Sequence, residues 1–131
     1  SQEMGDLNAD DYKNALENVL TANGPEGIDR VLDNYELDVI IAPTGAPSWP
    51  IDVINGDHYM GGSSSPAARS GYPNITVPMG FVHGLPVGLS FFAEAFSEPK
   101  LIGLTYAFEQ YTKHRKPPEF IPTFDFTTKS Q

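Results

Sequence analysis

Residues 71–93, GYPNITVPMGFVHGLPVGLSFFA, contain two strand patterns on either side of a glycine-containing turn. The first pattern, residues 74–78, is rich in β-branched residues, and we expect Pro78 and Gly80 to break it because neither residue suits the interior of a strand. The second pattern, Pro86 to Ala93, carries four large apolar side chains. We predict that the two strands form a β-hairpin over the connection at residues 80–85.

A third strand is predicted at residues 38–42, DVIIA, because successive β-branched apolar residues are typical of a strand that is covered on both faces. Pro43 is expected to end it. The following stretch, residues 44–70, is rich in proline, glycine and serine and has little periodicity. A long irregular segment inside a compact domain is usually a functional loop or lid.

Two helices are predicted before the first strand. Residues 8–20 have Asn8 as a candidate cap and one apolar stripe, whose members are Tyr12, Ala15, Leu16, Val19 and Leu20. The sequence Asn-Gly-Pro at residues 23–25 is expected to stop this helix. A second short helix is then predicted from Pro25 or Glu26 to about Tyr35, since proline suits a first turn.

The clearest helix pattern follows the strand predicted at residues 86–93. Ser97 is its candidate cap, and the predicted apolar face comprises Leu101, Leu104, Phe108 and Tyr111. Basic residues at 113–116 are placed at its carboxyl end, where cations complement the helix dipole, and Pro117-Pro118 is expected to end it. Residues 119–131 are predicted to be a tail without a regular period.

Composition limits the partners. The 131 residues can form one hydrophobic core, and 17 acidic against 8 basic side chains give a formal charge of −9, which opposes nucleic-acid binding. Cysteine is absent, and His58, His83 and His114 are far apart in sequence, so no metal and no cofactor are predicted. No apolar run is long enough for a membrane span. The compartment stays open, with the cytoplasm slightly favoured.

Three segments in this order resemble the carboxy-terminal third of amidase-signature enzymes: DVIIAPT at 38–44, GYPNITVPMG at 71–80 and GLPVGL at 84–89. The resemblance implies an α/β fold, namely the carboxy-terminal part of the amidase-signature mixed β-sheet, with about three strands and two to three helices. The expected organisation of residues 1–131 is a helical segment at 1–36, then strands, pocket loop and final helix at 37–118, and a tail at 119–131.

The resemblance also implies a function. The family hydrolyses carbon–nitrogen bonds of non-peptide or terminal amides with a nucleophilic serine, a second serine and a lysine, all in the amino-terminal part of its domain. The implied partners are therefore the amino-terminal part of the same amidase and a small amide substrate. Because this chain has none of the matching catalytic positions, we expect it to be inactive alone. Its uncovered faces are expected to cause self-association.

The serine-rich sequence GGSSSP at residues 61–66 superficially resembles the catalytic GGSSGG element of the family, but it stands at a different place. It can be interpreted as a nucleophile site, as a pocket loop or as an ordinary turn. The predicted substrate contacts are Thr44, Ser63, Ser64 and Ser65. A base for a serine nucleophile is not evident, because the lysines at 100, 113, 116 and 129 lie in the last helix or the tail.

Two other functions remain open on the sequence. One is a non-catalytic binding or scaffold domain, and the other is a small self-sufficient serine hydrolase that uses Ser63 to Ser65. The aromatic and sulfur-containing side chains of the long loop, Trp49, Tyr59 and Met60, are expected either to line an apolar substrate channel or to cover an edge of the sheet.

Overall fold

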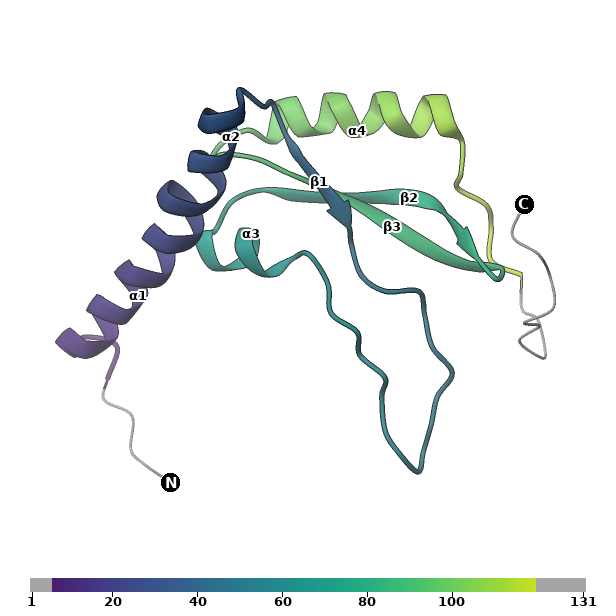
Figure 1. Cartoon of the computed structure of the whole chain (residues 1–131), viewed down its shortest axis with the longest axis horizontal. Coiled ribbons are helices and arrows are strands. Elements are labelled where there is room, and N and C mark those ends of the chain that lie inside the picture. The colour runs from purple at the N-terminus through teal and green to yellow at the C-terminus, as the bar shows by residue number, and fades with distance from the viewer. Residues whose placement is uncertain (1–5, 120–131) are drawn as a thin grey trace.

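The computed structural model describes residues 6–119 of the chain. Its centre is an antiparallel sheet of three strands in the order β1-β3-β2. The strands are β1 (Ile40–Pro43), β2 (Asn74–Val82) and β3 (Leu85–Phe92), so the last strand in the chain is the central one. Figure 1 shows helices on both sides of this sheet. The predicted α/β class with three strands is confirmed.

The predicted hairpin is present and is tighter than expected. His83 and Gly84 form a two-residue turn with φ angles of 50° and 80°, the positive values that a type I′ hairpin turn requires at both positions. The prediction that β2 breaks at Pro78 is wrong. Instead the register with β3 shifts between Pro78 and Gly80, and the strand continues past this bulge to Val82.

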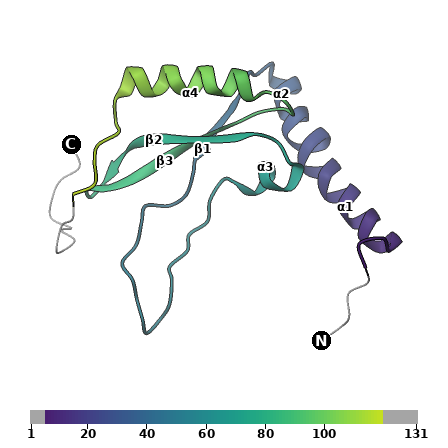
Figure 2. The same ribbon diagram turned by 180° about the vertical axis from the view of Figure 1, so that it is seen from behind.

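Alternation along β3 assigns the two faces of the sheet. Leu89 and Phe91 point to the side of α4 (Glu98–Thr112), since the ring of Phe91 meets Phe108 of that helix edge-on at 5.7 Å. Gly88, Ser90 and Phe92 therefore point to the opposite side. Figures 1 and 2 show α4 running along one side of the sheet and the long loop and α3 on the other. We call these the α4 face and the open face.

The buried apolar residues belong to the strands, the helices that pack on them and the segment after β3. They are Ile28, Leu32, Ala67, Val77, Leu89, Phe91, Phe92, Ala93 and Leu101. By contrast, Ile41 of β1 is 57% exposed. The prediction that the first strand is covered on both faces is therefore wrong for this chain, because α4 packs on β2 and β3 rather than over β1.

The amino-terminal helices are continuous rather than separate. Helix α1 (Asp10–Asn23) leads into a π-helical segment η1 (Gly24–Asp29) and then α2 (Arg30–Tyr35). The α-helix ends at Asn23, where residues 23–25 were predicted to stop it, but the chain stays helical. Pro25 lies in the first turn of the π-helical segment, a position that tolerates its missing N–H. Asn8 is not the cap of α1: Ala9 holds that position without a side-chain hydrogen bond.

Helix α4 begins where predicted, but the role of Ser97 differs and the helix ends before Pro117. The Ser97 hydroxyl does not cap the helix and instead donates to the carbonyl oxygen of Glu94 at 2.7 Å. The helix ends at Thr112 with Lys113 as its C-cap, so the basic residues at 113–116 follow its carboxyl end. Tyr111 is 91% exposed, and the inward side consists of Leu101, Thr105 and Phe108.

The long loop contains one element that the sequence pattern did not reveal. After an irregular course through residues 44–64, the chain forms the short helix α3 (Ser65–Ser70), and Gly71 ends it with a φ of 77°. The predicted tail, 119–131, lies outside the described residues except for Glu119. No helix in the described part is long and apolar enough to cross a bilayer.

Candidate substrate pocket

Three hydroxyl groups meet on the open face of the sheet. Thr44 follows β1, Thr76 lies on β2, and Ser90 lies on β3 directly opposite Thr76 in the strand register. The Oγ atom of Ser90 is 2.9 Å from Oγ1 of Thr44 and 3.1 Å from Oγ1 of Thr76, and the two threonine oxygens are 3.3 Å apart. We call these three residues the hydroxyl cluster. Ser90 is buried, whereas the two threonines are accessible.

Gly88 allows the hydroxyl cluster to form. A Cβ atom at this position would lie 2.8 Å from Thr44 Oγ1 and 2.8 Å from Thr76 Cγ2. The Gly88 carbonyl oxygen also accepts a hydrogen bond from the Thr44 backbone N–H at 2.8 Å. The central strand thus fixes Thr44 at the end of β1 through its backbone and leaves room for the threonine side chain.

A hollow of about 450 Å³ lies beside the hydroxyl cluster. Its walls come from the end of β1 and from the middle of the hairpin, and they consist of Thr44, Gly45, Ala46, Thr76, Val77, Pro78, Pro86, Val87 and Gly88. This is the usual character of a small-molecule site, in which apolar walls provide contact area and a few polar groups fix orientation. The hydroxyls can donate to or accept from a carbonyl or amide group.

The serine-rich segment, residues 61–66, comes back to Thr44 at the hydroxyl cluster. Gly45 and Gly62 form an isolated antiparallel bridge, and the Ser63 N–H donates to the Thr44 carbonyl oxygen at 3.1 Å. The Oγ atom of Ser63 is shielded from solvent and has no hydrogen-bond partner among the described residues. An unpaired buried hydroxyl is costly, and this oxygen is the one in the segment that carries this cost among the described residues.

The four sequence-predicted contact residues therefore separate into two pairs. Thr44 and Ser63 lie together, whereas Ser64 and Ser65 begin α3 and are exposed. Sequence analysis missed Thr76 and Ser90. Strand alternation within the predicted hairpin was the signal that could have found them. To pair the two residues, however, the register between the strands has to be known.

Lys100 and Lys116 offer no base to these hydroxyls. Lys100 lies on α4, which covers the other face of the sheet, and its ammonium is 3.5 Å from Asp38 and 3.7 Å from Glu94. Lys116 lies over the ring of Phe81 on β2, 5.6 Å from its centroid. Within residues 6–119, no three His, Cys, Asp or Glu side chains are grouped as metal ligands would be.

The aromatic residues of the long loop contact one another. Trp49 and Tyr59 meet edge-on with their ring centroids 6.2 Å apart, and the Trp49 indole N–H donates to Asp57 at 3.4 Å. Tyr59 and Met60 are 72% and 81% exposed. In the described chain Trp49 and Tyr59 connect the two arms of the loop, and Met60 is exposed.

The same chain has clear relatives. No protein-family model matches it. It is 41% identical over 96 residues to a probable amidase of Arabidopsis thaliana, covering 72% of this chain and 16% of the relative. It is 34% identical over 93 residues to a glutamyl-tRNA(Gln) amidotransferase subunit of Pseudothermotoga lettingae, covering 68% of this chain and 20% of the relative.

Solved structures of peptide amidases are also similar to this chain. The peptide amidase PAM in complex with the competitive inhibitor chymostatin is 47% identical, with a TM-score of 0.85 over 90% of this chain and 24% of that chain. Native peptide amidase from Stenotrophomonas maltophilia is 46% identical, with a TM-score of 0.82 over 90% and 23%. The chain belongs to the amidase signature family. It matches the carboxy-terminal part of the amidase-signature fold and spans about a quarter of these solved enzymes.

The Gly71-Tyr72-Pro73 motif of this amidase-signature chain connects the sheet to the amino-terminal helices. The Tyr72 hydroxyl donates to Oδ2 of Asp29 in η1 at 2.7 Å, and a Cβ atom at Gly24 would lie 2.9 Å from the tyrosine oxygen. The hydrogen bond to Asp29, followed by desolvation and the charge of Asp29, raises the pKa of Tyr72 to about 12, above its ordinary value of about 10.

Replacing Tyr72 with phenylalanine is expected to lower the free energy of unfolding by about 1.5 kcal/mol at pH 7, because a hydrogen bond to a charged group is lost. Since the folded pKa is raised, this stabilisation is fully present below about pH 10 and is lost as the pH rises towards about 12. Urea unfolding between pH 7 and 12 measures it. Tyr106→Phe is the control, since Tyr106 is 62% exposed; an equal loss in both variants would contradict the expectation.

Proposed function

We propose that this chain forms one wall of the substrate pocket of an amide hydrolase whose catalytic groups lie in a preceding part of the same protein. The observation that supports it most strongly is the agreement in sequence and fold with a peptide amidase over 90% of this chain but only 24% of the enzyme. The hollow beside the hydroxyl cluster supports the same function, because it is an apolar cavity with hydrogen-bonding groups at one side.

The proposed reaction is acyl transfer followed by hydrolysis. The oxygen of a serine outside this chain attacks the carboxamide carbon, and the carbon–nitrogen bond breaks as the proton of that serine passes through the second serine and the lysine to the leaving amine. Water then attacks the acyl-enzyme, which releases the carboxylic acid and restores the serine. This chain supplies no step of the proton transfer. It binds and orients the substrate.

The proposed substrate class is a terminal carboxamide on a peptide or a similarly substituted acyl group. The similarity to the solved peptide amidase extends over 90% of this chain at 47% identity, compared with 68% of the chain at 34% identity for the amidotransferase relative. In this assignment residues 37–118 provide the strands, the pocket loop and the final helix, and residues 1–36 provide a helical segment.

Thr44 and Ser63 are the proposed contact residues of this wall. Thr44 lines the hollow directly. The backbone N–H of Ser63 donates a hydrogen bond to Thr44, and the Ser63 hydroxyl is shielded and has no partner in the described chain. Ser64 and Ser65, which were predicted as contacts from the sequence, are assigned instead to the start of α3. In this position they present their side chains to solvent.

A chimera tests the function. In it, this chain replaces the equivalent part of the Stenotrophomonas maltophilia peptide amidase, with which it shares 46% identity. The chimera is expected to release ammonia from a peptide amide, and the isolated chain is expected to release none. A folded chimera without turnover contradicts the proposal. Turnover by the isolated chain that disappears on Ser63→Ala would favour a self-sufficient serine hydrolase instead.

The contact residues are tested in the same chimera. Thr44→Val and Ser63→Ala are each expected to raise KM about tenfold, which corresponds to one lost hydrogen bond of about 1.4 kcal/mol. Ser64→Ala and Ser65→Ala are matched controls from the same segment, and their KM is expected to stay within about twofold. Steady-state ammonia release measures all four. Equal effects in both pairs would remove the distinction between contact residues and helix-start residues.

A further inference from the structure

Helix α1 carries an apolar stripe that the described chain covers only in part. Tyr12, Leu16, Val19 and Leu20 lie on one side of the helix at 100° per residue, and their side chains are 42%, 44%, 42% and 40% exposed. None of the 14 residues of α1 is buried. Figure 1 shows the helix extending away from the sheet rather than lying across it. We call these four residues the α1 stripe.

Helix α1 contacts α3, but these contacts leave none of its residues buried. Isolated helices shorter than about 12–15 residues are marginal in water, and in proteins most of the stability of a helix comes from packing of its apolar side. The α1 helix has no side-chain cap, and the charge pattern provides only two acidic residues in its first turn. Its amphipathic sequence therefore indicates a partner on the stripe.

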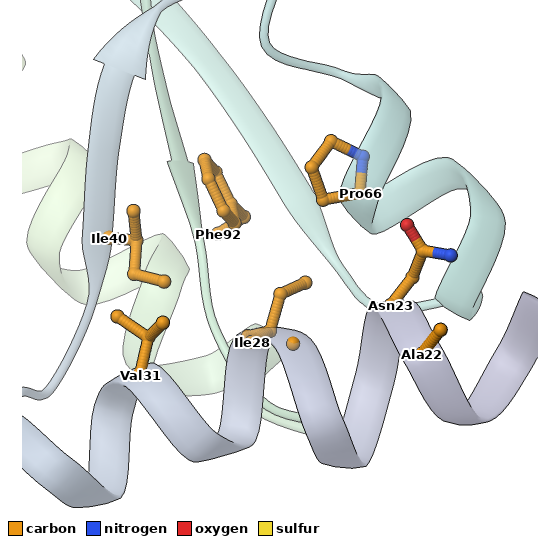
Figure 3. A pocket seen from close by; sticks show the side chains of 8 residues that line it. Ala22, Asn23, Ile28, Val31, Ile40, Pro66 and Phe92 are labelled. Carbon is orange, nitrogen blue, oxygen red and sulfur yellow. The ribbon is translucent and has the colours of Figure 1, made fainter.

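The α1 stripe leads into an apolar hollow at the carboxyl end of the helix. This hollow has a volume of about 380 Å³, and its walls include Ala22, Ile28, Val31, Ile40, Pro66 and Phe92. Figure 3 shows Ile40 and Phe92 from the sheet, Val31 and Ile28 from the helices, and Pro66 from α3 arranged around it. Its wall is almost free of polar groups, and Phe92 places it on the open face of the sheet.

We infer that the α1 stripe and this hollow form one continuous docking surface for an apolar segment of the preceding part of the amidase domain. The inference rests on the proposed function, because the occupant is the part of the enzyme that carries the catalytic groups. The size of the solved relative supports this occupant. This chain matches 24% of a solved peptide amidase, so about three-quarters of that enzyme has no counterpart in the described fold.

Cysteine labelling tests the surface, since the chain contains no cysteine of its own. Leu16→Cys places a thiol in the α1 stripe. Asn18→Cys places one on the opposite side of the same helix, at 200° from Leu16 by the helix repeat of 100° per residue. Both variants are made in the 131-residue chain and in the peptide amidase chimera. Maleimide modification of the peptide that contains the new thiol is then followed by mass spectrometry.

The expected result is a thiol at position 16 that reacts at least about tenfold more slowly in the chimera than in the isolated chain, with less than about twofold change at position 18. Equal reactivity of position 16 in both proteins would overturn the inference. Protection of position 16 in the isolated chain, together with a dimeric mass on size-exclusion chromatography with light scattering, would assign the surface to a second copy and overturn the proposed occupant.

Turnover of the chimera separates this inference from the proposed function. An active chimera in which position 16 stays reactive contradicts the docking surface and leaves the function intact. An inactive chimera in which position 16 is protected contradicts the function and leaves the surface intact. A Leu16→Ala variant that lowers the Tm of the chimera but not that of the isolated chain is the second measurement, with Asn18→Ala as its control.

Discussion

Replacing Leu101 with alanine is expected to lower the free energy of unfolding of this chain by about 2–5 kcal/mol. Leu101 is fully buried on the inward side of α4 and belongs to the cluster that includes Phe91 and Leu89 of the central strand. The sheet beneath it is held by backbone pairing on both sides of β3, so it cannot collapse into the space that the leucine leaves. The lost contacts and the remaining cavity both contribute to the effect.

Ile102 provides the matched control for this substitution. It is the next residue on the same helix, but its side chain is 60% exposed. Ile102→Ala is expected to change the free energy of unfolding by less than about 0.5 kcal/mol, as is usual for surface positions. Urea denaturation with an unchanged m-value measures both variants. If the two substitutions cost the same, α4 does not pack on the sheet as described.

Replacing Gly88 with alanine is expected to cost about 2–3 kcal/mol, the upper part of the range for overpacking. The added methyl group would lie 2.8 Å from an atom of each threonine in the hydroxyl cluster and 3.2 Å from Thr44 Cβ. Threonine side chains are stiff because they branch at Cβ. Either Thr44 or the central strand has to move, and the hydroxyl cluster is lost with that movement.

Gly103 is the matched glycine for comparison. It lies in α4, and a Cβ atom there meets nothing within 4 Å. Gly103→Ala is therefore expected to stabilise the chain by about 0.5–1 kcal/mol, because alanine is the better helix former. Thermal and urea unfolding of the two variants should move in opposite directions. A stabilising Gly88→Ala would mean that Thr44 and Thr76 do not converge on the central strand.

If both expectations hold, the packing of the sheet and the shape of the pocket wall both depend on β3. Leu89 and Phe91 hold α4 on one face, while Gly88 and Ser90 shape the hydroxyl cluster on the other. A change that shifts β3 by one residue would exchange these faces and would place apolar side chains in the pocket. We therefore expect substitutions on β3 to affect stability and substrate binding together in the intact enzyme.

The sequence by itself determined the local elements and the family. The hairpin, the α4 helix and the order of the DVIIAPT, GYPNITVPMG and GLPVGL segments all follow from residues that are neighbours in the chain, since turn chemistry and apolar periodicity act over short distances. The strands were placed with errors at their ends because a bulge at Pro78 and Gly80 depends on the partner strand.

Only the tertiary structure decided which residues form the pocket wall and how far α1 is exposed. Thr76 and Ser90 meet because of the strand register, and Ser63 reaches Thr44 because the long loop closes through the Gly45–Gly62 bridge. The exposure of Leu16 on α1 likewise depends on what lies over that face. Contacts between residues far apart in the chain are set by how whole elements pack, and single-residue patterns do not encode that arrangement locally.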